Sequence, residues 1–126
     1  MLRSITFMVC LLGLAGCPDD GGVSPRKACE DTSAALCERI YTCLTPEELA
    51  AKSFPASESA CITNLEASEG CSAKTTQNAC TGNEKYHPSE AATCSDQVTG
   101  LTCGQLRDPL FSVNVDAPAC AKVCSI

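Results

Sequence analysis

Large apolar and aromatic side chains are scarce in this chain. Its 126 residues include no tryptophan, three phenylalanines, two tyrosines and two methionines. Aromatic side chains supply much of the buried surface of an ordinary core, and a chain of this length forms at most one ordinary domain. We therefore expect covalent crosslinks to replace part of the hydrophobic core.

Basic residues are also few, and they do not form a stripe. Nine lysines and arginines stand against fifteen acidic residues, which gives a formal net charge of −6. Nucleic-acid binding needs clustered basic side chains that neutralise phosphates. We expect no nucleic-acid partner, and the dispersed acidic residues indicate a solvated surface.

The sequence lacks the patterns that usually accompany catalysis or cofactor binding. It has no glycine-rich phosphate loop, no HExxH, no GxSxG and no Cys-x-x-Cys. Its single histidine, His87, precedes Pro88 at the start of a predicted helix, where a capping or surface role is the ordinary interpretation. We predict no catalytic residue and no cofactor. The alternative is a small extracytoplasmic enzyme or ligand carrier with a site around His87.

The apolar segment near the N-terminus is too short to cross a membrane as a helix. Ile5–Leu14 has about half of the roughly twenty residues that a bilayer requires, and it suits the apolar core of a signal peptide. The following Leu14-Ala15-Gly16-Cys17 resembles the lipobox of bacterial lipoproteins, in which the cysteine receives diacylglycerol and becomes the mature N-terminus. We predict a lipoprotein signal peptide over residues 1–16 and lipidation at Cys17. A plain secreted protein cut nearby would instead leave Cys17 as an unpaired thiol.

Cysteine is the residue that the chain has in excess, with twelve in all. The signal peptide contains Cys10 and the lipid occupies Cys17, so an even number is left to pair. We predict that these residues form about five disulfides: Cys29, Cys37, Cys43, Cys61, Cys71, Cys80, Cys94, Cys103, Cys120 and Cys124. Structural zinc sites favour cysteines separated by two to four residues, and only Cys120 and Cys124 have that spacing. An exported chain also meets an oxidising compartment, so we predict disulfides and no metal site.

The part of the chain after the signal peptide is predicted to be a tether followed by one domain. Residues 17–27 contain the lipidated cysteine and a flexible Gly- and Pro-rich tether, and residues 28–126 form a small, mainly α, disulfide-rich domain of several short helices. The predicted helices cover residues 29–44, a segment from the capping box at Thr45–Glu48, 56–68, 72–80, 88–100, a turn after Thr102, and one or two turns in 118–123. Residues 82–85 and 111–115 are predicted as loop.

The whole chain resembles small cysteine-rich lipoproteins of myxobacteria and related delta-proteobacteria. The residues that carry the resemblance are the lipobox Leu14–Cys17, the segment Cys37–Cys43 and the run from Tyr86 to Cys103. The resemblance implies a location in the cell envelope, and it implies no particular activity.

We therefore expect a lipoprotein anchored to a bacterial membrane, on its periplasmic or outer-surface side, with a non-catalytic binding or structural role. Its expected partners are the membrane, through the N-terminal lipid, and an envelope protein or glycan.

Overall fold

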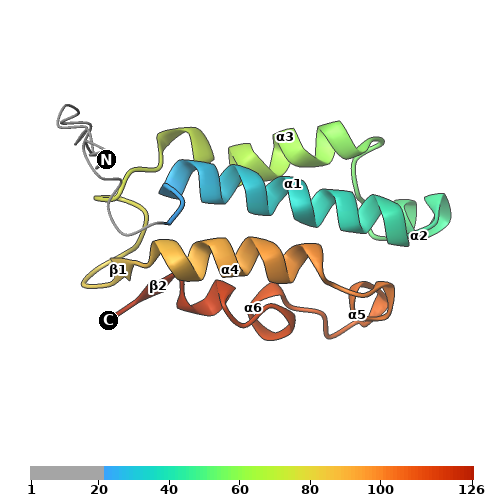
Figure 1. Ribbon diagram of the computed structural model, residues 1–126. Coiled ribbons are helices and arrows are strands. Elements are labelled where there is room, and N and C mark those ends of the chain that lie inside the picture. The colour runs from blue at the N-terminus through green and yellow to red at the C-terminus, as the bar shows by residue number, and fades with distance from the viewer. Residues whose placement is uncertain (1–21) are drawn as a thin grey trace, which may run out of the picture.

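The computed structural model describes residues 22–126 (Figure 1). The predicted signal peptide, Cys17 and most of the predicted tether lie outside the described residues. In chain order the elements are α1 (Pro25–Cys43), α2 (Pro46–Ala51), α3 (Glu58–Glu69), the 3-10 turn η2 (Cys71–Ala73), β1 (Lys85–Tyr86), α4 (Pro88–Thr99), α5 (Cys103–Arg107), α6 (Val113–Asp116), the 3-10 turn η3 (Cys120–Lys122) and β2 (Cys124–Ser125). None of the helices within residues 22–126 has the length and apolarity required to cross a bilayer.

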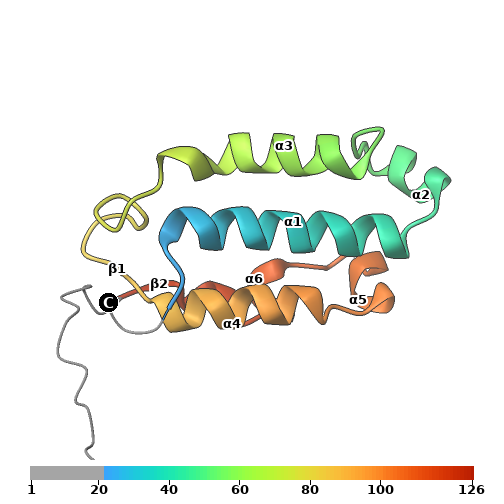
Figure 2. The same cartoon turned by 45° about the horizontal axis from the view of Figure 1, so that its top comes forward.

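The central element is α1, with α3 along one side of it and α4 along the other (Figure 2). The helix begins at a polar cap, because the Ser24 Oγ accepts a hydrogen bond from the N–H of Lys27 at 3.4 Å. Pro25 occupies its first turn, where no intrahelical donor is needed. The folded domain therefore includes residues 25–27, which the sequence analysis assigns to the tether.

Three other helix ends follow from local sequence, as predicted. The Thr45 hydroxyl accepts from the N–H of Glu48 at 3.3 Å, while the Glu48 carboxylate accepts from the N–H of Thr45 at 2.8 Å. Thr102 and Gln105 form the same reciprocal pair at the start of α5. After α3, Gly70 adopts φ +65°, the left-handed conformation that terminates many helices.

The hydrophobic core lies between the C-terminal half of α1, the helix α4 and the segment after α4. Val98 and Leu101 are the largest of its fully buried side chains. Its members are Ile40, Cys43, Leu44, Cys94, Val98, Leu101, Leu106, Ala117 and Ala119. Arg39 closes one side of this core, since its guanidinium donates two hydrogen bonds, of 3.0 and 2.7 Å, to the carbonyl of Leu101. Only small and medium-sized side chains form this cluster, which agrees with the shortage of aromatic residues.

Disulfides provide the rest of the connections, and the predicted fold class is confirmed. All ten cysteines of residues 22–126 are bonded: Cys29–Cys71, Cys37–Cys61, Cys43–Cys103, Cys80–Cys124 and Cys94–Cys120. Three of these bonds leave α1, two toward α3 and η2 and one toward α5. The domain is thus a small, mainly α, disulfide-rich fold.

Three local predictions are wrong. The helix predicted over residues 72–80 is a 3-10 turn at its start and irregular turns afterwards. Residues 113–116, predicted as part of an extended loop, form the helical turn α6. Two-residue strands, β1 and β2, pair in antiparallel fashion with Tyr86 opposite Cys124. The Cys80–Cys124 bond and the core contacts of Val113 explain these differences, because both are set by tertiary contacts and not by local pattern.

Candidate functional site

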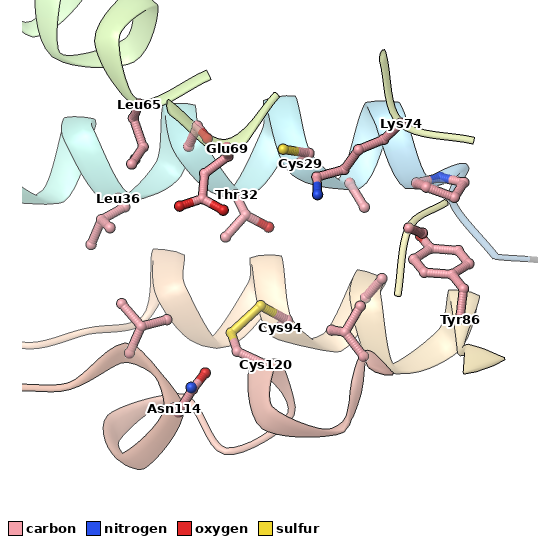
Figure 3. A pocket seen from close by; sticks show the side chains of 17 residues that line it. Cys29, Thr32, Leu36, Leu65, Glu69, Lys74, Tyr86, Cys94, Asn114 and Cys120 are labelled. Carbon is pink, nitrogen blue, oxygen red and sulfur yellow. A yellow bond between two sulfur atoms is a disulfide. The ribbon is translucent and has the colours of Figure 1, made fainter. Parts of the chain in front are cut away.

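The main concave feature of the described residues is a groove of about 480 Å³ along α1 (Figure 3). Helices α1 and α4 line it, with α3 and the segment after η2 on one side and α6 and η3 on the other. The lining residues are Pro25, Ala28, Cys29, Thr32, Ser33, Leu36, Leu65, Glu69, Lys74, Ala79, Tyr86, Ala91, Cys94, Val113, Asn114, Cys120 and Val123. Pockets that hold small molecules typically measure roughly 300–1,000 Å³, so the groove is of ligand size.

Small and sulfur-containing side chains make the groove deep and apolar. Ala28 of α1 and Ala91 of α4 are both buried, and neither extends far enough to fill the space between the walls. The Cys94–Cys120 bond ties α4 to η3 and borders the groove on that side (Figure 3). Leu36 and Leu65 are the largest aliphatic side chains at the far end. The resulting surface offers van der Waals contact and few hydrogen-bond partners.

One basic side chain, that of Lys74, reaches toward the groove from the segment after η2 (Figure 3). Its backbone is held firmly: the N–H of Lys74 donates to the carbonyl of Cys71 at 3.1 Å. On either side of it, Asn78 donates to the carbonyl of Ala73 at 2.9 Å and accepts from the N–H of Thr75 at 2.6 Å. Among residues 22–126, the half-buried ammonium group of Lys74 has no ion-pair partner.

The other polar groups of the groove are spread along its length. Glu69, at the end of α3, is exposed and lies on the same wall as Lys74, but nearer to Thr32 of α1 (Figure 3). Asn114 of α6 is exposed on the opposite wall. A ligand in the groove would therefore meet a cation near one end, an anion in the middle and an uncharged amide across from it.

Tyr86 closes the end of the groove nearest to the start of α1. Its hydroxyl donates a hydrogen bond to the carbonyl of Val23 at 2.7 Å, so it is already used in holding the entering chain. Burial raises the pKa of the Tyr86 hydroxyl above its ordinary value, which keeps the hydroxyl protonated as a donor. This contact fixes the position of the chain before α1 and is structural.

His87, the candidate of the alternative enzyme hypothesis, lies outside the groove. Its Nε2 is 3.0 Å from the Oγ and 3.4 Å from the carbonyl oxygen of Ser125, across the β1–β2 end of the domain. Among residues 22–126, no carboxylate forms a hydrogen bond or ion pair with His87. A serine–histidine nucleophile also needs an orienting group and donors for an oxyanion. The arrangement of these two side chains is that of a short contact between β2 and the N-terminus of α4.

The groove was not predictable from the sequence. Of the predicted site residues, Cys29, Cys94 and Cys120 line it as halves of disulfides, and Cys17 lies outside the described residues. Lys74 gave no signal, because it falls in a segment with no apolar period and no recognisable motif. Its role near the groove depends on the Cys29–Cys71 bond, which places the segment after η2 against α1.

Two further features of residues 22–126 were considered as sites. A second hollow of about 150 Å³, at the α2–α5 end, is lined by core side chains such as Phe54 and Phe111 and is too small for most ligands. Within the same range, no cluster of three or more His, Cys, Asp or Glu side chains could hold a metal ion.

Comparison of the chain with protein-family models, with curated proteins and with solved structures finds no match. The site is therefore interpreted from its own geometry.

Proposed function

We propose that this protein is a cell-envelope lipoprotein, anchored to a bacterial membrane through Cys17, and that its domain acts by binding a ligand in the groove and not by catalysis. The observation that carries the binding role is the groove, an apolar concavity of ligand size. The resemblance of Leu14-Ala15-Gly16-Cys17 to a lipobox supports the anchor. Two or more acyl chains on one cysteine suffice for stable attachment, at about 0.8 kcal/mol per buried CH₂.

The start of the folded domain lies close to the proposed anchor. Gly22 packs so tightly on Pro88 that a Cβ at this position would overlap the proline ring. The carbonyl of Val23 is held by Tyr86. The chain between Cys17 and Gly22 spans at most about 18 Å when fully extended. The proposal therefore places the β1–β2 end of the domain nearest the bilayer, with the Tyr86 end of the groove beside it.

The absence of a catalytic role is inferred from the surroundings of the groove. Its lining contains no histidine, and the cysteines among its lining residues are in disulfides. Glu69 and Lys74 are the charged side chains that line it, and no hydrogen bond joins either to a nucleophile among residues 22–126. A nucleophile, a base and an orienting group in mutual contact are the ordinary requirement for acyl or glycosyl transfer.

The anchor is tested by a Cys17→Ser variant of the full chain, with Cys10→Ser as the matched control within the predicted signal peptide. We expect the control to remain in the membrane fraction and to carry a lipid-modified N-terminal cysteine by mass spectrometry. The Cys17→Ser chain is expected to lose the modification. An unmodified mature N-terminus at another residue in the wild type would contradict the proposal.

The binding role is tested in cells by filling the groove. Thr32 lines the groove on α1, whereas Thr42 on the same helix is exposed and does not. We expect Thr32→Phe to reproduce the phenotype of a gene deletion, while Thr42→Phe behaves as wild type. Both variants must retain full disulfide formation and normal membrane levels. A Thr32→Phe strain with wild-type behaviour would show that the groove is not the functional site.

A further inference from the structure

We infer that the groove binds a single hydrocarbon chain that ends in a free carboxylate, with the carboxylate held by Lys74. This inference rests on the proposed function and names the class of ligand. It draws on three properties of the site: its dimensions, the lack of backbone partners in its walls, and the position of its one cation.

The dimensions fit one acyl chain better than a peptide helix. The groove follows α1 from Pro25 to Leu36, which is about 17 Å at the rise of 1.5 Å per residue. A helix of that length, with a diameter of about 10 Å, occupies roughly 1,300 Å³. The groove holds about 480 Å³, so most of such a helix would remain outside it. A single extended hydrocarbon chain needs far less width.

The walls also disfavour an extended peptide. A bound strand gains affinity from main-chain hydrogen bonds to an exposed sheet edge. Most of this groove is lined by α1, α3 and α4, whose backbone N–H and C=O groups are used within the helices. A peptide backbone buried there would lose its hydrogen bonds to water without replacement. A hydrocarbon chain has no such groups to satisfy.

The charge of the site selects the head group and its direction. Lys74 lies toward the Tyr86 end, where its ammonium group is half-buried and reaches over the groove beside Cys29 (Figure 3). A carboxylate at this end gains a charge-assisted hydrogen bond. The opposite direction would move the carboxylate toward the Leu36 end, past Glu69, and would leave Lys74 over the hydrocarbon. The chain therefore lies with its carboxylate at the Tyr86 end and its methyl end between Leu36 and Leu65.

Placement at the membrane gives this ligand a route. In the proposed orientation, the Tyr86 end of the groove lies nearest the bilayer, within the roughly 18 Å reach of residues 17–22. Fatty acids partition into bilayers because their chains are apolar. A groove that opens at this height can exchange them with the membrane surface.

The test uses the membrane-anchored full chain in phospholipid vesicles that contain a photoactivatable dodecanoic acid, or its methyl ester. We expect saturable labelling by the acid, mapped by mass spectrometry to peptides that line the groove, and suppressed by unlabelled dodecanoate. Lys74→Gln should weaken competition by dodecanoate at least about tenfold and leave labelling by the ester unchanged. Lys52→Gln, an exposed lysine outside this groove, is the matched control.

Two groove-filling variants guard against a folding artefact. Thr32→Phe on α1 and Asn114→Trp on α6 enter the groove from opposite walls, and both should abolish labelling by acid and ester. Equal competition by dodecanoate in the Lys74→Gln and wild-type proteins would overturn the role of the carboxylate. Labelling that maps elsewhere would overturn the whole inference. If Thr32→Phe nevertheless reproduces the deletion phenotype, the proposed binding function stands with a different ligand.

Discussion

Two of the disulfides enclose two others along the chain, and this nesting separates the effect of a crosslink from the effect of burial. The nested sets are Cys29–Cys71 around Cys37–Cys61 and Cys80–Cys124 around Cys94–Cys120. With its inner bond intact, the first outer bond closes segments of 8 and 10 residues, and the second closes segments of 14 and 4. Each effective loop is thus 18 residues long. A loop of this size corresponds to about 3 kcal/mol in the chain-entropy description of disulfide stabilisation.

Burial distinguishes the two outer bonds. Cys71 is 1% exposed, whereas Cys29, Cys80 and Cys124 are half-buried. Replacing Cys71 by alanine removes a buried sulfur and leaves part of its space empty, at a cost of about 1 kcal/mol. We expect the Cys80→Ala/Cys124→Ala protein to lose about 3 kcal/mol of unfolding free energy. The Cys29→Ala/Cys71→Ala protein should lose about 4 kcal/mol.

Urea unfolding followed by far-ultraviolet circular dichroism measures both losses. Double variants are required, since a single cysteine left unpaired can exchange with the remaining disulfides. The two proteins should unfold with similar m-values, because the effective loops match. A Cys80→Ala/Cys124→Ala protein that is destabilised by more than the Cys29→Ala/Cys71→Ala protein would refute the burial argument. Losses below 1 kcal/mol in both would refute the loop argument.

Two further predictions concern single side chains. The Glu48 carboxylate accepts a hydrogen bond from Arg107 at 2.8 Å, and this bond lowers the pKa of Glu48 in the folded state. Its stabilising effect is therefore complete above the unfolded pKa of about 4.3 and lost as the pH falls below it; Glu48→Gln should be less stable than wild type at neutral pH and equal to it near pH 2. Gly70→Ala should destabilise the domain by about 1 kcal/mol in thermal unfolding, because φ is +65° there. Gly100→Ala, where φ is −82°, is the control and should be neutral or slightly stabilising; equal effects at the two glycines would contradict the backbone argument.

The sequence predicted those parts of the fold that depend on neighbours in the chain. The capping boxes at Thr45 and Thr102 and the stop at Gly70 each involve residues at most four positions apart, so their patterns can be recognised directly. The start of α1 had similar signals in Ser24 and Pro25, but the glycines before them favoured a linker. The lipidation site at Cys17 remains a prediction.

The remaining features depend on residues far apart in sequence. The strands β1 and β2 are two residues each, too short for an alternating pattern, and they pair residues about forty positions apart. The groove likewise combines Ala28, Lys74 and Val123 from three separate segments. Their meeting is fixed by the disulfide pairing, and ten cysteines allow on the order of a thousand pairings. No reading of local pattern could choose among them.

The groove and the crosslinks have a common origin in the composition of the chain. Helix α3 buries a single residue, Cys61. Burial of one such side chain contributes about 1–2 kcal/mol, whereas each residue fixed in a helix loses roughly 1–2 kcal/mol of backbone entropy. Packing of α3 therefore cannot hold its twelve residues against α1, and the Cys37–Cys61 and Cys29–Cys71 bonds do so instead. A helix held by large side chains would fill the space beside it with them. A helix held by cystines can stand against α1 while the space beside Leu65 stays open, so the same shortage of large side chains that requires the disulfides also leaves room for a ligand.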